Sequence, residues 1–415
     1  MSVKFAEVFV PVRVATIRQI VFEDGERSCA VIDNEGMPLF LPNLFLTTQM
    51  RNVSLSSSTL SNNAGHLCAF LQAMEESQIN LAARLSEGRV LKSFEVEALR
   101  GDLQRRLASK PQGRALHSYF SQSAHISKEV MHARITVSTK YLGWLATLYL
   151  HNPHDPDELA RVLASMREIR PTNKKRNTLR KKRGLNVETA SAIKEVLRPG
   201  SQYNIWSDAA IQVRNRLILS LLYEAGIRRG ELLNLMIEDF NFSANSLEVV
   251  RRADEKADPR LDQPLVKTND RVIPVKAALM AEVRFYISEH RRHVSGAKKH
   301  GFLFVTHKIG PTVGQPMTIV NYKHVISTLR TAVPPLKDFS GHDLRHYWNE
   351  RFSDLMDKTE LTPTQQEQIR SQLMGWKFGS GTAATYNQRF VERKAAEFGM
   401  TLQTDIIGSE GVRGR

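Results

Sequence analysis

The sequence predicts a mainly α fold with a small β-sheet, an α+β chain of several domains. Three observations support this prediction. Long segments place apolar residues at helical spacing, shorter segments alternate as strands do, and 415 residues are too many for one core. We therefore expect a strand-rich N-terminal segment, a small helical domain and a larger, mostly helical domain that carries the sheet.

The strand-rich segment covers residues 1–53, as an arm or a small domain. Residues 3–46 are rich in Val, Ile and Phe, and residues 8–12 and 29–32 have the clearest strand character. Residues 33–36 supply turn chemistry. We therefore expect strands rather than helix throughout residues 3–46.

Residues 54–166 are predicted to form the small helical domain. The serine-rich stretch 54–58 can cap a first helix, a second helix is expected from Ser93, and a third lies near residue 145. Each has apolar residues at helical spacing, which predicts one buried face. The inward positions are predicted to be Leu60, Ala64, Leu67, Cys68, Leu71 and Met74; Phe94, Leu99 and Leu103; and Leu142, Leu145, Ala146 and Tyr149.

The larger domain is predicted to cover residues 185–399, with a C-terminal tail at 400–415. A leucine-rich helix should end near Gly226, because glycine is a natural C-terminal cap, and a new helix should begin at Gly230. Alternation from Leu247 to Arg251 predicts a strand. Two short strands are expected within 264–275, and Gly399 should end the last helix.

Composition indicates the kind of partner. The net charge of +15 and the pI of about 9.8 favour a polyanion, because neutralised phosphates release condensed counterions. No apolar run approaches the ~20 residues of a membrane span, and no secretory signal is recognised. Cys29 and Cys68 lack a metal-ligand spacing, which predicts reduced thiols, no metal site and a cytoplasmic chain.

A basic linker is predicted at residues 167–184, where the positive charge is densest. Pro171 and the lack of an apolar stripe argue against a packed helix. Such a run is usually a solvated tether. Between two candidate DNA-binding domains we interpret it instead as a strap along phosphates, formed by Lys174, Lys175, Arg176, Arg180, Lys181, Lys182 and Arg183.

Several residues in the C-terminal half could grip and attack a phosphodiester. The planar forks of two arginines suit non-bridging oxygens, and a histidine can shuttle a proton. An indole N–H can donate to a phosphate, and a phenol can attack it once a base and neutralising charge are present. In chain order the candidates are Arg228, Lys267, His342, Arg345, Trp376 and Tyr386, with Glu231 placed to orient Arg228.

The order and surroundings of these residues resemble the tyrosine recombinase (integrase) family of phages and mobile elements. The segments are Ala-Gly-Ile-Arg-Arg-Gly-Glu, Lys-Thr-Asn-Asp-Arg-Val-Ile-Pro, Gly-His-Asp-Leu-Arg-His, Leu-Met-Gly-Trp and Ala-Ala-Thr-Tyr. The resemblance covers about residues 185–400. It depends on the whole set, because a lone His-x-x-Arg or a lone tyrosine is common.

The resemblance implies a role for each candidate. It selects Arg228 over Arg229, because the family's arginine stands two residues after the glycine. It assigns Lys267 to a β-hairpin that enters the minor groove and protonates the leaving 5′ oxygen. It makes His346 a supporting residue and Tyr386 the nucleophile of a 3′-phosphotyrosyl link. Two departures are a polar segment at 362–372 that looks inserted, and a longer gap before Tyr386.

The function implied by the resemblance is site-specific recombination of a mobile element, without metal or cofactor. The partners would be double-stranded DNA and further copies of the chain, as a tetramer on two DNA sites, in the cytoplasm at the nucleoid. Accessory proteins stay open. The alternatives are a type IB topoisomerase-like enzyme and a DNA-binding regulator that has the fold but no activity. A polybasic protein on membrane lipid is the weakest alternative.

Overall fold

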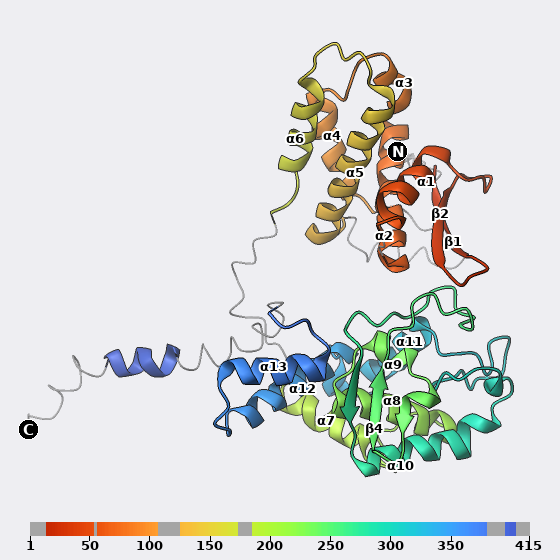
Figure 1. The fold of residues 1–415 in the computed structure, drawn as a ribbon, viewed down its shortest axis with the longest axis vertical. Coiled ribbons are helices and arrows are strands. Elements are labelled where there is room, and N and C mark those ends of the chain that lie inside the picture. Colours follow the sequence, from red (N-terminus) through yellow and green to blue (C-terminus); the bar gives the residue numbers. More distant parts are fainter. Residues whose placement is uncertain (1–13, 54–55, 107–124, 173–184, 380–394, 404–415) are drawn as a thin grey trace, which may run out of the picture. The chain divides into compact units, whose positions relative to one another are not determined.

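The computed structural model describes residues 14–53, 56–106, 125–172, 185–379 and 395–403. The chain divides into two compact units, 1–178 and 179–415, called here the first and the second unit. Their boundary falls inside the predicted basic linker. Helices predominate and the sheets are small and antiparallel, which confirms the predicted fold class (Figure 1).

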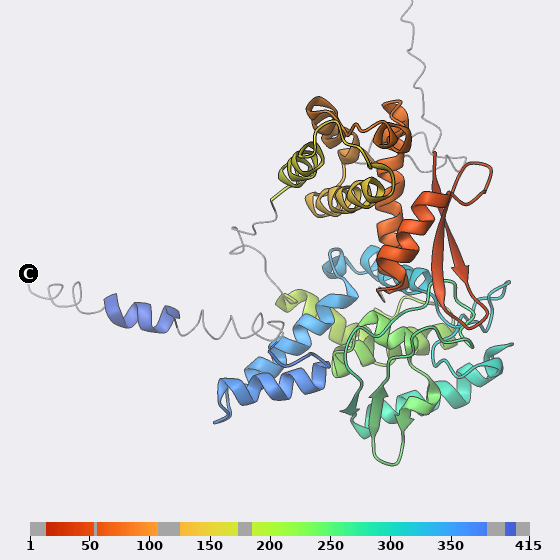
Figure 2. The ribbon, with the colours of Figure 1, turned by 45° about the horizontal axis from the view of Figure 1, so that its top comes forward.

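The first unit combines a β-hairpin with a helical bundle (Figures 1 and 2). The hairpin pairs β1 and β2 in antiparallel register, with Ile17 opposite Val31. A π-helical turn, Thr47–Arg51, extends the first helix. The elements are β1 (Thr16–Val21), β2 (Arg27–Ile32), α1 (Phe40–Leu46), α2 (Ser57–Glu76), α3 (Leu81–Ser86), α4 (Ser93–Gln104), α5 (Lys128–Tyr149) and α6 (Glu158–Glu168).

One apolar core holds the first unit together. Val31 of β2, Leu67 of α2 and Leu142 of α5 are fully buried in it. The alternating pattern of β2 and the helical spacing of α2 and α5 both direct apolar side chains inward. The strand-rich segment and the helices therefore share this core.

Two predictions for the first unit were wrong. Residues 40–46 form helix α1 rather than a strand, because Phe45 and Leu46 are buried while Phe40 stays 75% exposed, a one-sided helical pattern. Phe94 was expected to face inward, but it is 67% exposed at the start of α4. The three long helices predicted from spacing are confirmed as α2, α4 and α5.

The second unit places helices around a three-stranded sheet (Figure 1). The antiparallel order is β3-β4-β5, and Leu247 of β4 pairs with Phe240 and Ile273 on its two sides. The elements are α7 (Val187–Leu197), α8 (Ala209–Ala225), α9 (Arg229–Asn234), β3 (Phe240–Asn241), β4 (Ser246–Val249), β5 (Arg271–Pro274), α10 (Ala277–Phe285), α11 (Ile319–Ala332), α12 (Gly341–Met356) and α13 (Pro363–Met374). Residues 395–403 are also helical.

The core of the second unit is built on α8. Asp208 caps this helix by accepting a hydrogen bond from the backbone N–H of Ile211, at 2.8 Å. Leu217, Ile218 and Leu221 are buried against the sheet and the helices around it. This core fixes the end of α8, from which the candidate site begins.

Two predictions for the second unit were also wrong. Only one strand, β5, lies within 264–275, because residues 264–270 bond to other parts of the unit instead of pairing with β5. Gly399 does not end a helix, since residues 395–403 continue through it. In the described ranges, no helix combines the length and the apolar character that crossing a membrane requires.

Candidate active site

Arg228 stands on the turn between α8 and α9, as the sequence predicted. Helix α8 ends at Gly226, whose φ of +61° lies in the left-handed region. A Cβ at this position would lie 2.7 Å from the ring of Trp348, on α12. Gly226 therefore both turns the chain and lets α12 approach. Arg228 is the N-cap residue of α9, with 29% of its side chain exposed.

Glu231 is the buried centre of the site, with a fully buried side chain. Its carboxylate accepts hydrogen bonds from the backbone N–H of Arg228 at 3.0 Å, from the hydroxyl of Thr268 at 2.7 Å and from the guanidinium of Arg271 at 2.7 Å. The guanidinium of Arg228 lies 3.4 Å from the same group and that of Arg345 3.9 Å. One carboxylate thus gathers three guanidinium groups.

The charge balance at Glu231 favours an anion. Burial alone would raise the pKa of Glu231, but the charge and hydrogen bond of Arg271, the charge of Arg345 and the N–H of Arg228 outweigh it, so the pKa is lowered. The group is therefore a carboxylate near neutral pH. Three guanidinium charges against one carboxylate leave a net positive centre, which is open to solvent through Arg228.

Arg345 lies on the first turns of α12 and is 1% exposed. Asp343, in the first turn of this helix, accepts a hydrogen bond from the N–H of the N-cap residue Ser340 at 2.7 Å. The guanidinium of Arg345 donates to the carbonyl of Gly226 at 2.6 Å and to that of Met374 at 3.1 Å. Arg345 therefore joins α12 to the end of α8 and to the end of α13.

His342 precedes Arg345 by one helical turn and is exposed to solvent. Its ring meets that of His346 edge to face, with centroids 4.5 Å apart. Partial desolvation, then the positive charges of Arg345 and Arg228, lower the pKa of His342, while Asp343 opposes them. His342 is therefore neutral near pH 7 and can accept a proton at this site.

Trp376 follows Gly375, the left-handed residue that ends α13. It is 8% exposed and packs with Met374 and Trp348. The guanidinium of Arg345 lies 5.3 Å from the centre of its ring, within cation–π distance. The structure thus brings Trp376 together with Arg345, which lies beside Glu231 and one helical turn after His342.

Lys267 lies in the long connection between β4 and β5. Residues 264–270 do not form a strand, so Lys267 does not lie in the β-hairpin that was predicted from the sequence. Its side chain is exposed and makes no hydrogen bond or ion pair with any residue that the structure describes. The next residue, Thr268, bonds to Glu231, so the loop is attached to the site.

The remaining candidates lie outside the described residues. These are Tyr386 and the linker residues Lys174, Lys175, Arg176, Arg180, Lys181, Lys182 and Arg183. Their roles stay predictions. Within the described ranges, no group of three or more His, Cys, Asp or Glu side chains is arranged to hold a metal ion.

Arg271 was missed as a site residue by sequence reasoning. It begins β5, where residues 271–274 are alternately buried and exposed. The sequence Arg-Val-Ile-Pro does not show this alternation, because the exposed Val272 is apolar. The strand places Arg271 on the same face as Ile273, which is buried in the core. An arginine on a buried strand face requires a buried partner, and Glu231 is that partner.

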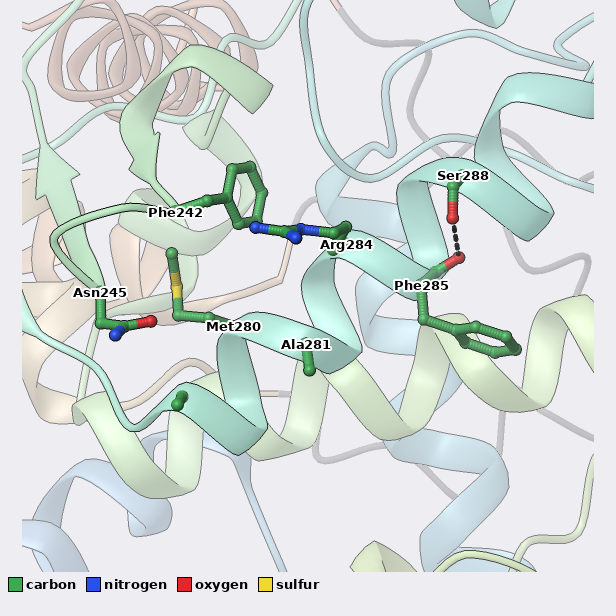
Figure 3. Close-up of a pocket in the computed structure, with 8 residues that line it drawn as sticks. Phe242, Asn245, Met280, Ala281, Arg284, Phe285 and Ser288 are labelled. Carbon is green, nitrogen blue, oxygen red and sulfur yellow. Dashed lines mark hydrogen bonds between the residues drawn. The ribbon is translucent and has the colours of Figure 1, made fainter.

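A surface pocket elsewhere in the second unit contains none of the predicted site residues. It lies between α10 and the turn that joins β3 to β4, and Arg284 stacks on the Phe242 ring at 4.9 Å (Figure 3). The other lining residues include Asn245, Met280 and Phe285. Arg284 is the only ionisable side chain among the residues that line it, so we assign no chemistry to this pocket.

Comparison with known proteins identifies the class of the second unit. Residues 201–359 match the model of the phage integrase family. The chain is therefore a relative of the tyrosine recombinases, and its similarity to the phage integrase family covers residues 201–359. This segment includes Arg228, Lys267, His342 and Arg345, and it ends before Trp376 and Tyr386.

Individual relatives agree with this class. Tyrosine recombinase XerC of Staphylococcus aureus (strain USA300 / TCH1516) is 27% identical over 139 residues, which are 34% of this chain and 40% of the relative. XerC of the bovine strain RF122 / ET3-1 has the same identity and coverage. The chain thus spans 40% of the length of these curated relatives.

Solved structures give weaker similarities. The Tn1549 transposon integrase in complex with circular intermediate DNA is 14% identical, with 83% of this chain and 94% of that chain covered and a TM-score of 0.49. The XerH recombinase bound to its difH substrate is 15% identical, with coverage of 82% and 80% and a TM-score of 0.47. At these scores the similarities carry no further argument.

Proposed function

We propose that the chain is a site-specific DNA recombinase of a mobile element, which cuts and rejoins DNA through a 3′-phosphotyrosyl link at Tyr386. The observation that carries this proposal is the convergence of Arg228, Arg271 and Arg345 on the single carboxylate of Glu231. A net positive centre with one partly exposed guanidinium suits a phosphodiester. The integrase-family domain at 201–359 gives the reaction class.

Each candidate has a part in the proposed reaction. Arg228 and Arg345 neutralise the scissile phosphate, and Trp376 closes the pocket beside Arg345. His342, neutral near pH 7, accepts the phenolic proton of Tyr386. The phenolate attacks phosphorus, the bond to the 5′ oxygen breaks, and the ammonium of Lys267 protonates that oxygen. Reversal by another 5′ hydroxyl rejoins the strand without an external energy source.

The proposed partners follow from the reaction. Double-stranded DNA agrees with the net charge of +15, and strand exchange between two duplexes requires a tetramer on two DNA sites. The proposed location is the cytoplasm, at the nucleoid. A type IB topoisomerase-like enzyme would relax supercoiled DNA without a specific site, so a relaxation assay with and without the element's end sequences separates the two functions.

The covalent link is the decisive test. A nicked suicide duplex that carries an end sequence of the element should trap a protein–DNA adduct, because the short strand diffuses away after cleavage. Tyr386→Phe should bind the same duplex and trap nothing, since phenylalanine has no nucleophilic oxygen. The adduct is measured by denaturing gel and by mass spectrometry of the modified peptide.

The matched control is Tyr203→Phe, which removes a phenol elsewhere in the second unit and should trap the adduct at the normal rate. An adduct formed by Tyr386→Phe would refute the proposed nucleophile. A regulator without activity would trap nothing in any variant, while it still bound the duplex.

The basic linker gives a second test of the DNA partner. Neutralising Lys174, Lys175, Arg176, Arg180, Lys181, Lys182 and Arg183 should weaken specific and non-specific duplexes alike. The slope of log K against log salt should fall by about 0.9 for each phosphate that the linker no longer neutralises. Fluorescence anisotropy over a salt series measures this slope. An unchanged slope would mean that the basic linker only connects the two units and does not bind DNA.

A further inference from the structure

The loop that carries Lys267 is held on its C-terminal side by three separate contacts. The hydroxyl of Thr268 donates to Glu231 at 2.7 Å, and the N–H of Asn269 donates to the carbonyl of Gly375 at 2.9 Å. The carboxylate of Asp270 accepts from the N–H of Arg251 at 2.7 Å. Because the three residues after Lys267 are all anchored, the position of its Cα is set while its side chain stays in solvent.

Arg271 ends this loop and links its anchors. Its guanidinium is fully buried and uses separate nitrogens for separate partners. Nη2 donates to Glu231 at 2.7 Å, Nη1 to the hydroxyl of Thr268 at 3.0 Å and Nε to the carbonyl of Leu373 at 2.7 Å. The last contact reaches the C-terminal end of α13, three residues before Trp376. Arg271 thus connects α9, the Lys267 loop and α13.

The packing at Gly375 leaves this arrangement little freedom. Gly375 has a φ of +66°, and a Cβ there would lie 2.7 Å from Nη1 of Arg271, 2.8 Å from the carbonyl oxygen of Asn269 and 2.9 Å from Cβ of Thr268. Only a residue without a side chain lets the loop approach so closely. The position of the Lys267 loop is therefore fixed relative to the segment that precedes Trp376.

We propose that Arg271 is a positioning residue, which presets the Lys267 loop beside the arginine cluster so that the Lys267 ammonium reaches the leaving 5′ oxygen. This inference rests on the proposed function. Arg271 is buried, so it acts through Thr268, the neighbour of Lys267. The planar guanidinium donates to three acceptors in fixed directions: the Glu231 carboxylate, the Thr268 hydroxyl and the Leu373 carbonyl. A lysine ammonium cannot reproduce that geometry.

The experiment compares two forms of the nicked suicide duplex, with oxygen or with sulfur at the bridging 5′ position. A thiolate leaves without a proton, so the sulfur form bypasses the general acid. The full-length wild-type chain should cleave both forms. Arg271→Lys and Thr268→Val should slow cleavage of the oxygen form on the order of 10–10²-fold, the cost of a misplaced group, and should recover most of this rate on the sulfur form. Lys267→Ala should show the same pattern with a larger effect.

The controls separate positioning from folding. Arg291→Lys alters another buried arginine of the second unit, which donates to the carbonyls of Phe302, Ala297 and His300. It should lower the melting temperature without any difference between the oxygen and sulfur forms. Thr268→Val is nearly isosteric at a half-buried position, so it tests the inference even where Arg271→Lys folds poorly.

The possible outcomes are distinct. Unchanged cleavage of the oxygen form by Thr268→Val and Arg271→Lys overturns the inference, as does an equal slowing on both forms. In either case, a wild-type adduct at Tyr386 leaves the proposed function standing. A wild-type chain that binds both duplexes and cleaves neither contradicts the proposed function itself.

Discussion

Arg134 of the first unit and the Glu231 cluster of the second unit hold buried arginines in different ways. In the first unit, Arg134 donates to the carbonyls of Leu103 and Arg105, both at 2.8 Å, and burial lowers its pKa. In the second unit, Arg271 and Arg345 lie buried beside a buried acid, Glu231. Burial of a guanidinium carries a desolvation penalty in both units, and in the second unit the counter-charge of Glu231 offsets part of it. The Glu231 cluster therefore differs from Arg134 in holding several opposite and like charges together inside the fold.

Removing the charge of Glu231 should give the largest decrease in the free energy of unfolding. Glu231→Gln keeps the shape but leaves buried guanidinium groups without their counter-charge, so we expect a decrease of about 3–5 kcal/mol in the free energy of unfolding. The comparison in the first unit is Glu87→Gln, at an exposed ion pair with Arg89. It should cost at most about 1 kcal/mol. Urea unfolding measures both, and equal decreases would refute the contrast.

Replacing one glycine in each unit by alanine should change stability in opposite directions. Gly226→Ala should destabilise the second unit by about 1–3 kcal/mol, because φ is +61° and the new Cβ would clash with Trp348. Gly143 lies inside α5 of the first unit, and a Cβ there would meet Leu163 at an ordinary 3.5 Å. Gly143→Ala should therefore stabilise by about 0.5–1 kcal/mol. The melting temperatures of the two variants test this expectation, and shifts of the same sign would contradict it.

A smaller, pH-dependent effect is expected at His307. Burial, then the charge of Arg214, lowers the pKa of His307 to about 4 from an ordinary 6.5, and its Nε2 lies 3.0 Å from the hydroxyl of Tyr286. Between these values the unfolded chain binds a proton that the folded chain does not. Stability should therefore fall as pH drops from about 6.5 to about 4. His307→Gln should flatten this part of the curve of melting temperature against pH; an unchanged slope would exclude His307 as its source.

The fold was predictable where one periodicity dominated the sequence. Helices α2, α5 and α8 have long apolar faces, and all three were predicted from the sequence. Helix α1 was not predicted, because seven residues rich in Leu and Phe fit a buried strand equally well. The exposure of Phe94 was also missed, since a position at a helix start has no complete turn before it to reveal its face.

The site was predictable as a set of residue types, not as a set of contacts. The motifs named Arg228, Arg345 and Glu231, and these do come together. Sequence reasoning could not tell that Arg345 bonds to the carbonyls of Gly226 and Met374, because those residues are distant in the chain. It overlooked Arg271 for the same reason: the buried partner lies 40 residues away.

The end of α13 has a mechanical consequence. The carbonyls of Leu373 and Met374 are held by Arg271 and Arg345, so the chain leaves Trp376 from a pinned point. Tyr386 lies ten residues after Trp376, and an extended chain of that length spans at most ~35 Å. Arg271 and Arg345 therefore also fix the point from which the chain continues toward Tyr386. In the proposed reaction, loosening either arginine would shift that point and slow the attack by Tyr386.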